Sequence, residues 1–227
     1  MVAHMPPFRE LYRDQRFVVI DKPWGIPVHA GPHGGASVED YFPLLSRRRD
    51  GPWLAHRLDS DTSGCLVIAL RRQALLAAQA AFAEGRVAKT YWAVVRGLPL
   101  ENAGTIDLPL RKRSRPGLGW RMVAGRGGDS AMTDWRVLGR ADDLTWLELR
   151  PRTGRTHQIR VHCASMGWPL LGDAIYGAGE GPLHLLARRI ALPLSPPLTA
   201  TAEPPAHMAE LLQMHWPEQA HACSVAI

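Results

Sequence analysis

The sequence predicts an α+β fold: a mixed, largely antiparallel sheet with flanking helices and loops, in a single domain over residues 1–227. Strand-like runs outnumber helix-like runs, and they cluster without the regular strand–helix–strand alternation of a parallel sheet. No internal repeat, low-complexity linker or change of composition divides the chain, which is long enough to bury a sizeable core.

The first half of the chain predicts three strands and one helix. "FVVI", at 17–20, is a strand that ends in the Pro/Gly turn "KPWG", and "CLVIAL", at 65–70, is a short buried strand. "RRQALLAAQAAFAEG", at 71–85, is rich in alanine, carries apolar residues at helical spacing and ends in a glycine, so it predicts a helix. "AKTYWAVVRG", at 88–97, is again strand-like.

The middle of the chain predicts a basic loop or hairpin followed by two strands. Residues 111–129, "RKRSRPGLGWRMVAGRGGD", are rich in arginine and glycine. "AMTDWRVLGR", at 131–140, and "DLTWLELRP", at 143–151, are close enough in sequence to pair as an antiparallel hairpin.

The last third predicts two helices that flank a strand. "THQIRVHCASMG", at 156–167, is a helix for which Thr156 is a suitable N-cap. The tail alternates as a strand over 182–194 and closes with a Pro-started helix near 204–216.

Charge and cysteine content narrow the class of protein. The net charge is +6 and the pI about 9.7, which favours a polyanionic partner. Only three of the 27 basic residues are lysines, and arginine suits bidentate phosphate contacts, although a coding bias would also produce this excess. The three cysteines form no CxxC pair, and the sequence has neither a signal peptide pattern nor a membrane-spanning run. We therefore expect a cytoplasmic protein without a membrane segment.

The stretch "HRLDSDTSG", at 56–64, sets two aspartates before a buried strand. An EF-hand that starts at Asp59 would need a Glu at its twelfth position, where Leu70 stands. A DxDx[TV] phosphatase would need an apolar strand before Asp59 and a Thr or Val at Ser63. The stretch alone is equally consistent with a turn that Asp59 caps, beside a solvated Arg57.

A second stretch, "RPRTGRTHQIRVH" at 150–162, holds four arginines within eleven residues, a density that favours binding over four separate structural roles. "TGRT" leads onto a helix N-terminus, where backbone N–H groups attract phosphate, so Arg155 and His157 are candidate phosphate contacts. Arg160 lies one turn from His157. Zinc is disfavoured, because His157, His162 and Cys163 would be spread around the helix.

Three motifs, "HRLDSDTSG", "KTYWAVVRG" and "RTGRTHQIRVHCASMGWPLLGDAIYG", together resemble the RluA-type pseudouridine synthases. "IDKPWGIPVHAG" and "LLARRIALPLSPP" are similar as well, so the resemblance covers residues 10–205 in the family's order. The sequence departs from the family at Asp129, where a lysine is usual. The S4-like RNA-binding domain that many relatives carry in front is also missing from this sequence.

The resemblance implies that uridine in a ribosomal or transfer RNA stem-loop is converted to pseudouridine without a cofactor or metal. The C1′–N1 bond breaks, the base turns, and C5 joins C1′. Because the base stays in the pocket and no water attacks, one carboxylate can suffice where a glycosidase needs two. We expect the protein to be a monomer.

By the same resemblance, Asp59 is the catalytic carboxylate, acting either as nucleophile at C1′ or as base. Arg160 would pair with Asp59 and keep it ionised in a dry site, and Tyr91 would pack on the base. The uridine must be flipped out of its stack, and Arg57 would fill the space it leaves. Asp61 is interpreted as a turn residue.

The basic loop predicts further RNA contacts, because it has the highest positive charge density outside the proposed site. We expect phosphate contacts from Arg111, Lys112, Arg113 and Arg115, with Trp120 as a stacking face. The alternative function is a non-catalytic RNA-binding or chaperone protein on the same fold. The retained set of Asp59, Tyr91 and Arg160 argues against it.

Overall fold

The computed structural model describes residues 7–31, 34–48, 50–115, 119–177 and 179–225, without the side chains of Arg115 and residues 222–225. The chain forms two compact units. Residues 1–89 and 186–205 make up the first, and residues 90–185 and 206–227 the second. Each unit thus gathers two separate segments of the chain.

The first unit is built on a sheet whose strands follow the order β1-β2-β4-β11, with β3 paired to β4 and β12 to β11. Its strands are β1 (Arg9–Arg13), β2 (Phe17–Lys22), β3 (Trp53–Leu54), β4 (Ser63–Ala69), β11 (Leu185–Leu192) and β12 (Leu198–Thr201). All these pairs are antiparallel except β4 with β11, which run parallel with Ser63 opposite Leu186. Every residue of β4 is buried, as the apolar run that begins at Cys65 predicts.

Three helical segments complete the first unit: η1 (Val38–Tyr41), α1 (Phe42–Leu45) and α2 (Arg72–Ala83). Helix α2 follows β4 directly and buries Ala74, Ala78 and Ala81 on one face. These residues recur at helical spacing, and small side chains let the helix approach its neighbours closely. The helix ends at Ala83 with Glu84 as its C-cap, and Gly85 follows with φ +68°, so the predicted glycine stop is confirmed.

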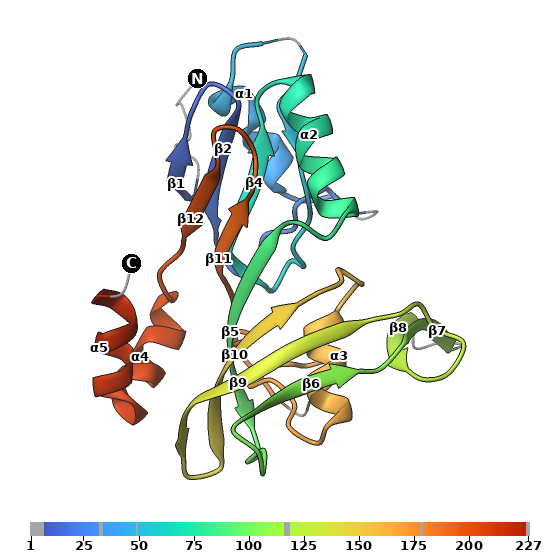
Figure 1. Cartoon of the computed structure of the whole chain (residues 1–227), viewed down its shortest axis with the longest axis vertical. Coiled ribbons are helices and arrows are strands. Elements are labelled where there is room, and N and C mark those ends of the chain that lie inside the picture. Colours follow the sequence, from blue (N-terminus) through green and yellow to red (C-terminus); the bar gives the residue numbers. More distant parts are fainter. Residues whose placement is uncertain (1–6, 32–33, 49, 116–118, 178, 226–227) are drawn as a thin grey trace. The chain divides into compact units, whose positions relative to one another are not determined.

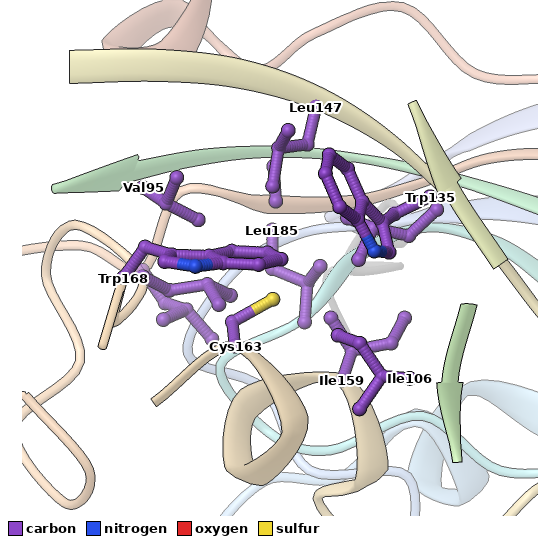
Figure 2. Packing of buried hydrophobic residues seen from close by; sticks show 12 residues of the cluster. Val95, Ile106, Trp135, Leu147, Ile159, Cys163, Trp168 and Leu185 are labelled. Atoms are coloured by element: carbon purple, nitrogen blue, oxygen red, sulfur yellow. The ribbon is translucent and has the colours of Figure 1, made fainter. Parts of the chain in front are cut away.

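The second unit contains a four-stranded antiparallel sheet in the order β5-β10-β9-β6. The strands are β5 (Ala88–Arg96), β6 (Ala103–Asp107), β9 (Met132–Ala141) and β10 (Leu144–Pro151), and the predicted β9–β10 pairing is confirmed. Helix α3 (Gln158–Ser165) contributes Ile159 and Cys163 to the core of this unit. Figure 2 shows both side chains pointing into a cluster with Trp135 and Trp168, whose rings meet edge to face at 5.1 Å.

A two-stranded hairpin, β7 (Leu110–Arg115) with β8 (Gly119–Ala124), extends from the second unit (Figure 1) and is called here the basic hairpin. The sequence predicted either a loop or a hairpin in this segment, and the structure shows a hairpin. Residues 116–118 lie outside the described residues. Helices α4 (Ala206–His215) and α5 (Pro217–Val225) close the described chain.

The predicted α+β class is confirmed, with antiparallel pairs predominating among the described strands. Helix α3 begins one residue later than predicted, because its N-cap is His157 and not Thr156. Within the described ranges, no helix combines the length and the apolar character that a membrane crossing requires.

Candidate active site

Asp59 lies in the first unit, in a tight turn just before β4. The amide of Thr62 donates to the main-chain oxygen of Asp59 at 3.2 Å, which closes a four-residue turn over residues 59–62, called here the Asp59 turn. Asp59 and Asp61 are both partly buried, and Asp61 lies within the turn, as predicted. The turn therefore presents Asp59 from a backbone that is fixed at both ends.

A buried lysine anchors this turn. The Nζ atom of Lys22, at the end of β2, donates to the main-chain oxygens of Pro23, Ile26 and Ser60 at 2.9, 2.7 and 2.8 Å. An ammonium group has three N–H donors, so the three carbonyls satisfy it completely. The oxygen of Ser60 also accepts from the amide of Gly25 at 3.0 Å. The residue that follows Asp59 is thus bonded twice to the segment that follows β2.

Burial lowers the pKa of Lys22 to about 8, although the nearby carboxylates of Asp61 and Asp59 act in the opposite direction. Lys22 is therefore still largely charged at neutral pH, and it places a cation near both aspartates. The sequence analysis missed this role. Its signal was the alternation in "VVIDK", which places Lys22 on the same buried face as Val18 and Ile20.

Two further residues, His56 and Gly64, fix the backbone before and at the start of β4. The amide of Val67 donates to Nε2 of His56 at 3.0 Å, and the His56 ring packs on Phe82 of α2 with 5.0 Å between ring centroids. Burial lowers the pKa of His56 to about 4, so its imidazole is neutral and can accept this bond. Gly64 adopts φ +104° and lies so close to β11 that a Cβ would meet the oxygen of Ala187 at 2.4 Å. The "TSG" part of the motif thus requires glycine.

Arg160 lies in the second unit, on α3, and is buried. Its Nε and Nη2 atoms each donate to the carboxylate of Asp173 at 2.8 Å, a bidentate pair between two side chains that are 3% and 0% exposed. Burial alone would raise the pKa of Asp173. The hydrogen bond and charge of Arg160, together with the amides of Tyr176 and Ile175, outweigh burial and hold that pKa below its usual value.

The expected pairing of Arg160 with Asp59 stays a prediction, because the two residues belong to different units. Tyr91 lies on β5, opposite Leu149 of β10, and packs against the core cluster of the second unit. Its proposed contact with the base also stays a prediction. Arg57, two residues before Asp59, is exposed, as a residue that touches RNA must be.

The dense arginines before α3 have structural partners, contrary to the inference from their density. Arg150 pairs with Glu148 at 2.8 Å, and Arg152 pairs with Asp134 in a bidentate contact at 2.7 and 2.9 Å. The Nε atom of Arg155 donates to the main-chain oxygen of Ser130 at 3.0 Å. These three arginines remain at the surface. With the buried Arg160 included, three of the four arginines in the segment are ion-paired.

The basic hairpin presents Arg111, Lys112 and Arg113 as exposed side chains, whereas the side chain of Arg115 lies outside the described residues. Trp120 is 47% exposed. Its ring is stacked with that of His157, with 5.8 Å between centroids, and the Nζ atom of Lys112 lies 4.5 Å from its centre. The hairpin thus brings Lys112 and His157 together around one aromatic ring.

His157 and His162 have different surroundings. His157 adopts φ 52° and ψ 22°, a left-handed conformation that is uncommon outside glycine, and its Nδ1 lies 2.8 Å from the hydroxyl of Tyr176. His162 is fully buried, and its two ring nitrogens meet Thr133 Oγ1 at 2.9 Å and the oxygen of Leu108 at 3.0 Å. With both nitrogens bonded to protein partners, His162 has none left for a metal.

Similarity to known proteins identifies the class of this protein. The family model for RNA pseudouridylate synthases matches residues 16–165, and the chain belongs to this family. It is an RNA pseudouridine synthase, an isomerase that acts on uridine in RNA.

An uncharacterized RNA pseudouridine synthase of Zymomonas mobilis is 40% identical over 211 residues, covering 89% of this chain and 96% of the relative. One from Synechocystis is 37% identical over 235 residues, covering 93% and 70%. Among solved structures, human RNA pseudouridylate synthase domain containing 4 is 30% identical with a TM-score of 0.77, covering 90% of this chain and 91% of that chain. Human RNA pseudouridylate synthase domain containing 1 is also 30% identical, with a TM-score of 0.75 and coverage of 88% and 87%.

Proposed function

We propose that the protein converts specific uridines in a structured ribosomal or transfer RNA to pseudouridine, as a cytoplasmic monomer that needs no cofactor or metal. Asp59 is the catalytic carboxylate. It acts on the C1′–N1 bond, either by attack at C1′ or by removal of the 2′ proton. C5 then joins C1′, C5 loses its proton, and N1 gains one, so the reaction is an isomerisation without net hydrolysis.

The observation that carries this proposal is the construction of the Asp59 turn. Three carbonyls bind Lys22, and two of the four turn residues, Asp59 and Ser60, accept backbone or ammonium hydrogen bonds through their main-chain oxygens. A turn fixed in this way holds its carboxylate in one position at the start of β4, as catalysis requires. A protein that only bound RNA would gain nothing from such rigidity around an anion.

Exposed cationic side chains bind the RNA. Arg57 stands beside the catalytic position, where it can enter the space that the flipped uridine leaves. Arg111, Lys112, Arg113 and Arg115 of the basic hairpin contact phosphates, with Arg155 and His157 beside them. Tyr91 packs on the flipped base.

The test compares Asp59→Asn with Asp61→Asn, two isosteric changes in one turn. We expect Asp59→Asn to lower turnover by several orders of magnitude with RNA affinity within a few-fold of wild type. Asp61→Asn keeps most activity, because Asp61 serves the turn. The substrate RNA is found first, by mapping pseudouridine across total RNA with and without the protein.

Two results would contradict the proposal. Near wild-type turnover in Asp59→Asn removes Asp59 from the chemistry. Wild-type protein that binds structured RNA and forms no pseudouridine in any RNA supports the non-catalytic alternative. The same assay in excess EDTA, on an RNA that folds without magnesium, should retain full activity. Loss that zinc or manganese restores would require a metal.

A further inference from the structure

Tyr176 connects three parts of the second unit that the sequence analysis treated separately. Its hydroxyl accepts a hydrogen bond from the amide of Met122, on β8, at 3.1 Å and lies 2.8 Å from Nδ1 of His157. Its ring lies under the guanidinium of Arg160, with 5.3 Å from Cζ to the ring centre. One side chain therefore touches the basic hairpin, the residue before α3 and the buried arginine.

The contact with β8 satisfies a donor at a sheet edge. In a two-stranded hairpin, each strand has one edge whose N–H groups find no partner within the hairpin. The Met122 amide points away from β7 to the Tyr176 hydroxyl, so this bond docks the hairpin edge onto the loop after α3. The hydroxyl accepts from this amide and keeps one donor and one acceptor site for its hydrogen bond with Nδ1 of His157.

The contact with His157 supports a strained residue. A left-handed histidine persists only where its surroundings fix it, and such residues cluster at functional positions. Here the Tyr176 hydroxyl holds one side of the imidazole, and the stacked ring of Trp120 comes from the hairpin. The hairpin thus reaches His157 twice: through Trp120 directly and through Met122 by way of Tyr176.

The backbone of Tyr176 belongs to the ion pair of Arg160. Oδ1 of Asp173 accepts from the amides of Ile175 and Tyr176, both at 3.0 Å, as well as from Nη2 of Arg160 at 2.8 Å. A displacement of Tyr176 must therefore also move the carboxylate that orients Arg160 or lengthen these bonds.

We propose that Tyr176 is a positioning residue that couples the basic hairpin to Arg160, so that RNA bound by the hairpin sets the geometry of the arginine. Its effect on turnover rests on the proposed function, whereas the coupling between hairpin and α3 does not. For this reason the coupling is tested by binding and the consequence by catalysis.

The test is Tyr176→Phe, which removes the hydroxyl and keeps the ring under Arg160. Amide hydrogen exchange is measured with and without bulk tRNA as the probe RNA. In the wild type, RNA should slow exchange both in β7–β8 and in α3. In Tyr176→Phe, the Met122 amide should exchange at least about tenfold faster without RNA, because it has lost its acceptor. Protection by RNA should remain in the hairpin and be lost in α3.

On the mapped substrate RNA, the same variant should lower kcat about tenfold, the effect of one hydrogen bond, and change KM less than twofold. The hairpin cations are untouched, so affinity is retained. Tyr12→Phe is the matched control, because it removes a hydroxyl that is bonded to Asp14 at 3.1 Å in the first unit. We expect it to leave kcat and α3 exchange unchanged.

Trp120→Leu provides an independent route, since it breaks the other link from hairpin to His157 and leaves Tyr176 intact. It should also uncouple α3 from RNA, and the double variant should lose less than the sum of the two single losses. Equal protection of α3 by RNA in wild type and both variants overturns the coupling, whether or not the protein is active. Lost coupling with unchanged kcat overturns the positioning role. A wild-type protein without activity overturns the proposed function, and the exchange data still decide the coupling.

Discussion

In the first unit, the Asp59 turn is held through main-chain oxygens, whereas in the second unit Arg160 is held through the side chain of Asp173. The acceptors of the buried cation also differ between the two regions. Lys22 binds main-chain carbonyls, whereas Arg160 binds a carboxylate. A backbone tether tolerates changes in the side chains it carries. An ion pair fails when either partner is lost. The two regions should therefore respond differently to substitution.

The largest effect is expected for Arg160→Met, which leaves the buried carboxylate of Asp173 without its cation. We expect a loss of about 3 kcal/mol or more in the free energy of unfolding, together with loss of turnover. Chemical denaturation measures the first and pseudouridine formation the second.

The double variant Arg160→Met with Asp173→Leu separates these effects. It removes the stranded charge, so stability should largely return while turnover stays low. Turnover that returns together with stability in the double variant would mean that Arg160 acts only through Asp173.

Lys22→Met tests the backbone tether through pH. As pH rises through about 8, the wild-type ammonium loses its proton, and a neutral amine has two donors for three carbonyls. We expect wild-type kcat to fall with a midpoint near pH 8. Lys22→Met should show a lower kcat without this limb.

The contribution of Lys22 to stability should move in the opposite direction to activity. The folded-state pKa of Lys22 lies below its usual value of 10.5, so between pH 8 and 10.5 the unfolded chain binds more protons at this residue. Lys22 therefore adds up to about 3 kcal/mol to the free energy of unfolding as pH rises across this window. Burial raises the pKa of the Cys65 and Cys163 thiols, which acts in the opposite direction, so the quantity to compare is the difference between wild type and variant. That difference should rise with pH for Lys22→Met and stay flat when the exposed Lys112 is replaced by Met. A flat difference for Lys22→Met contradicts the buried charge.

The smallest effect on turnover is expected from substitutions in the basic hairpin. Its cations take part neither in the hydrogen bonds of Lys22 nor in the ion pair of Arg160 with Asp173. Replacement of Arg111, Lys112, Arg113 and Arg115 by serine should reduce the slope of log affinity against log salt by about 0.7 to 0.9 per lost contact, or roughly three in all. Turnover at saturating RNA should change far less. Serine at four exposed arginines of the first unit, including Arg47 and Arg72, controls for net charge. A wild-type salt slope in the hairpin variant would indicate that the phosphate contacts are made by other residues, of which Arg150, Arg152 and Arg155 are the first candidates.

The same comparison explains what the sequence could predict. The Asp59 turn, α2 and the β9–β10 hairpin arise from contacts near in sequence, and their patterns predicted them. Strand β4 pairs with distant strands, but its apolar run was enough to predict a buried strand. The partner of Arg160 and the contacts of His157 come from the loop at Asp173 and Tyr176, which no local pattern specifies. The misplaced N-cap has this origin: Thr156 has the better capping side chain, but Tyr176 and Trp120 fix His157 in the left-handed conformation.

Lys22 shows a different limit. A lysine before proline usually suggests a solvated turn, and its burial depends on three carbonyls from two segments that fold around it. The alternation of β2 placed it inside, but the sequence could not show which acceptors would satisfy its charge.

The parallel pairing of β4 with β11 has a consequence for the order in which the protein is made. The strand that Gly64 packs against is synthesised long after the Asp59 turn, since the first unit needs residues 186–205. During translation, the growing chain holds Asp59, Tyr91 and Arg160 well before it holds the strand that completes the sheet under Asp59. A fragment that ends at residue 165, where the family match ends, would contain all three residues and still lack β11 and β12. We expect such a fragment to be inactive, and activity on the ribosome to begin only when the tail has emerged.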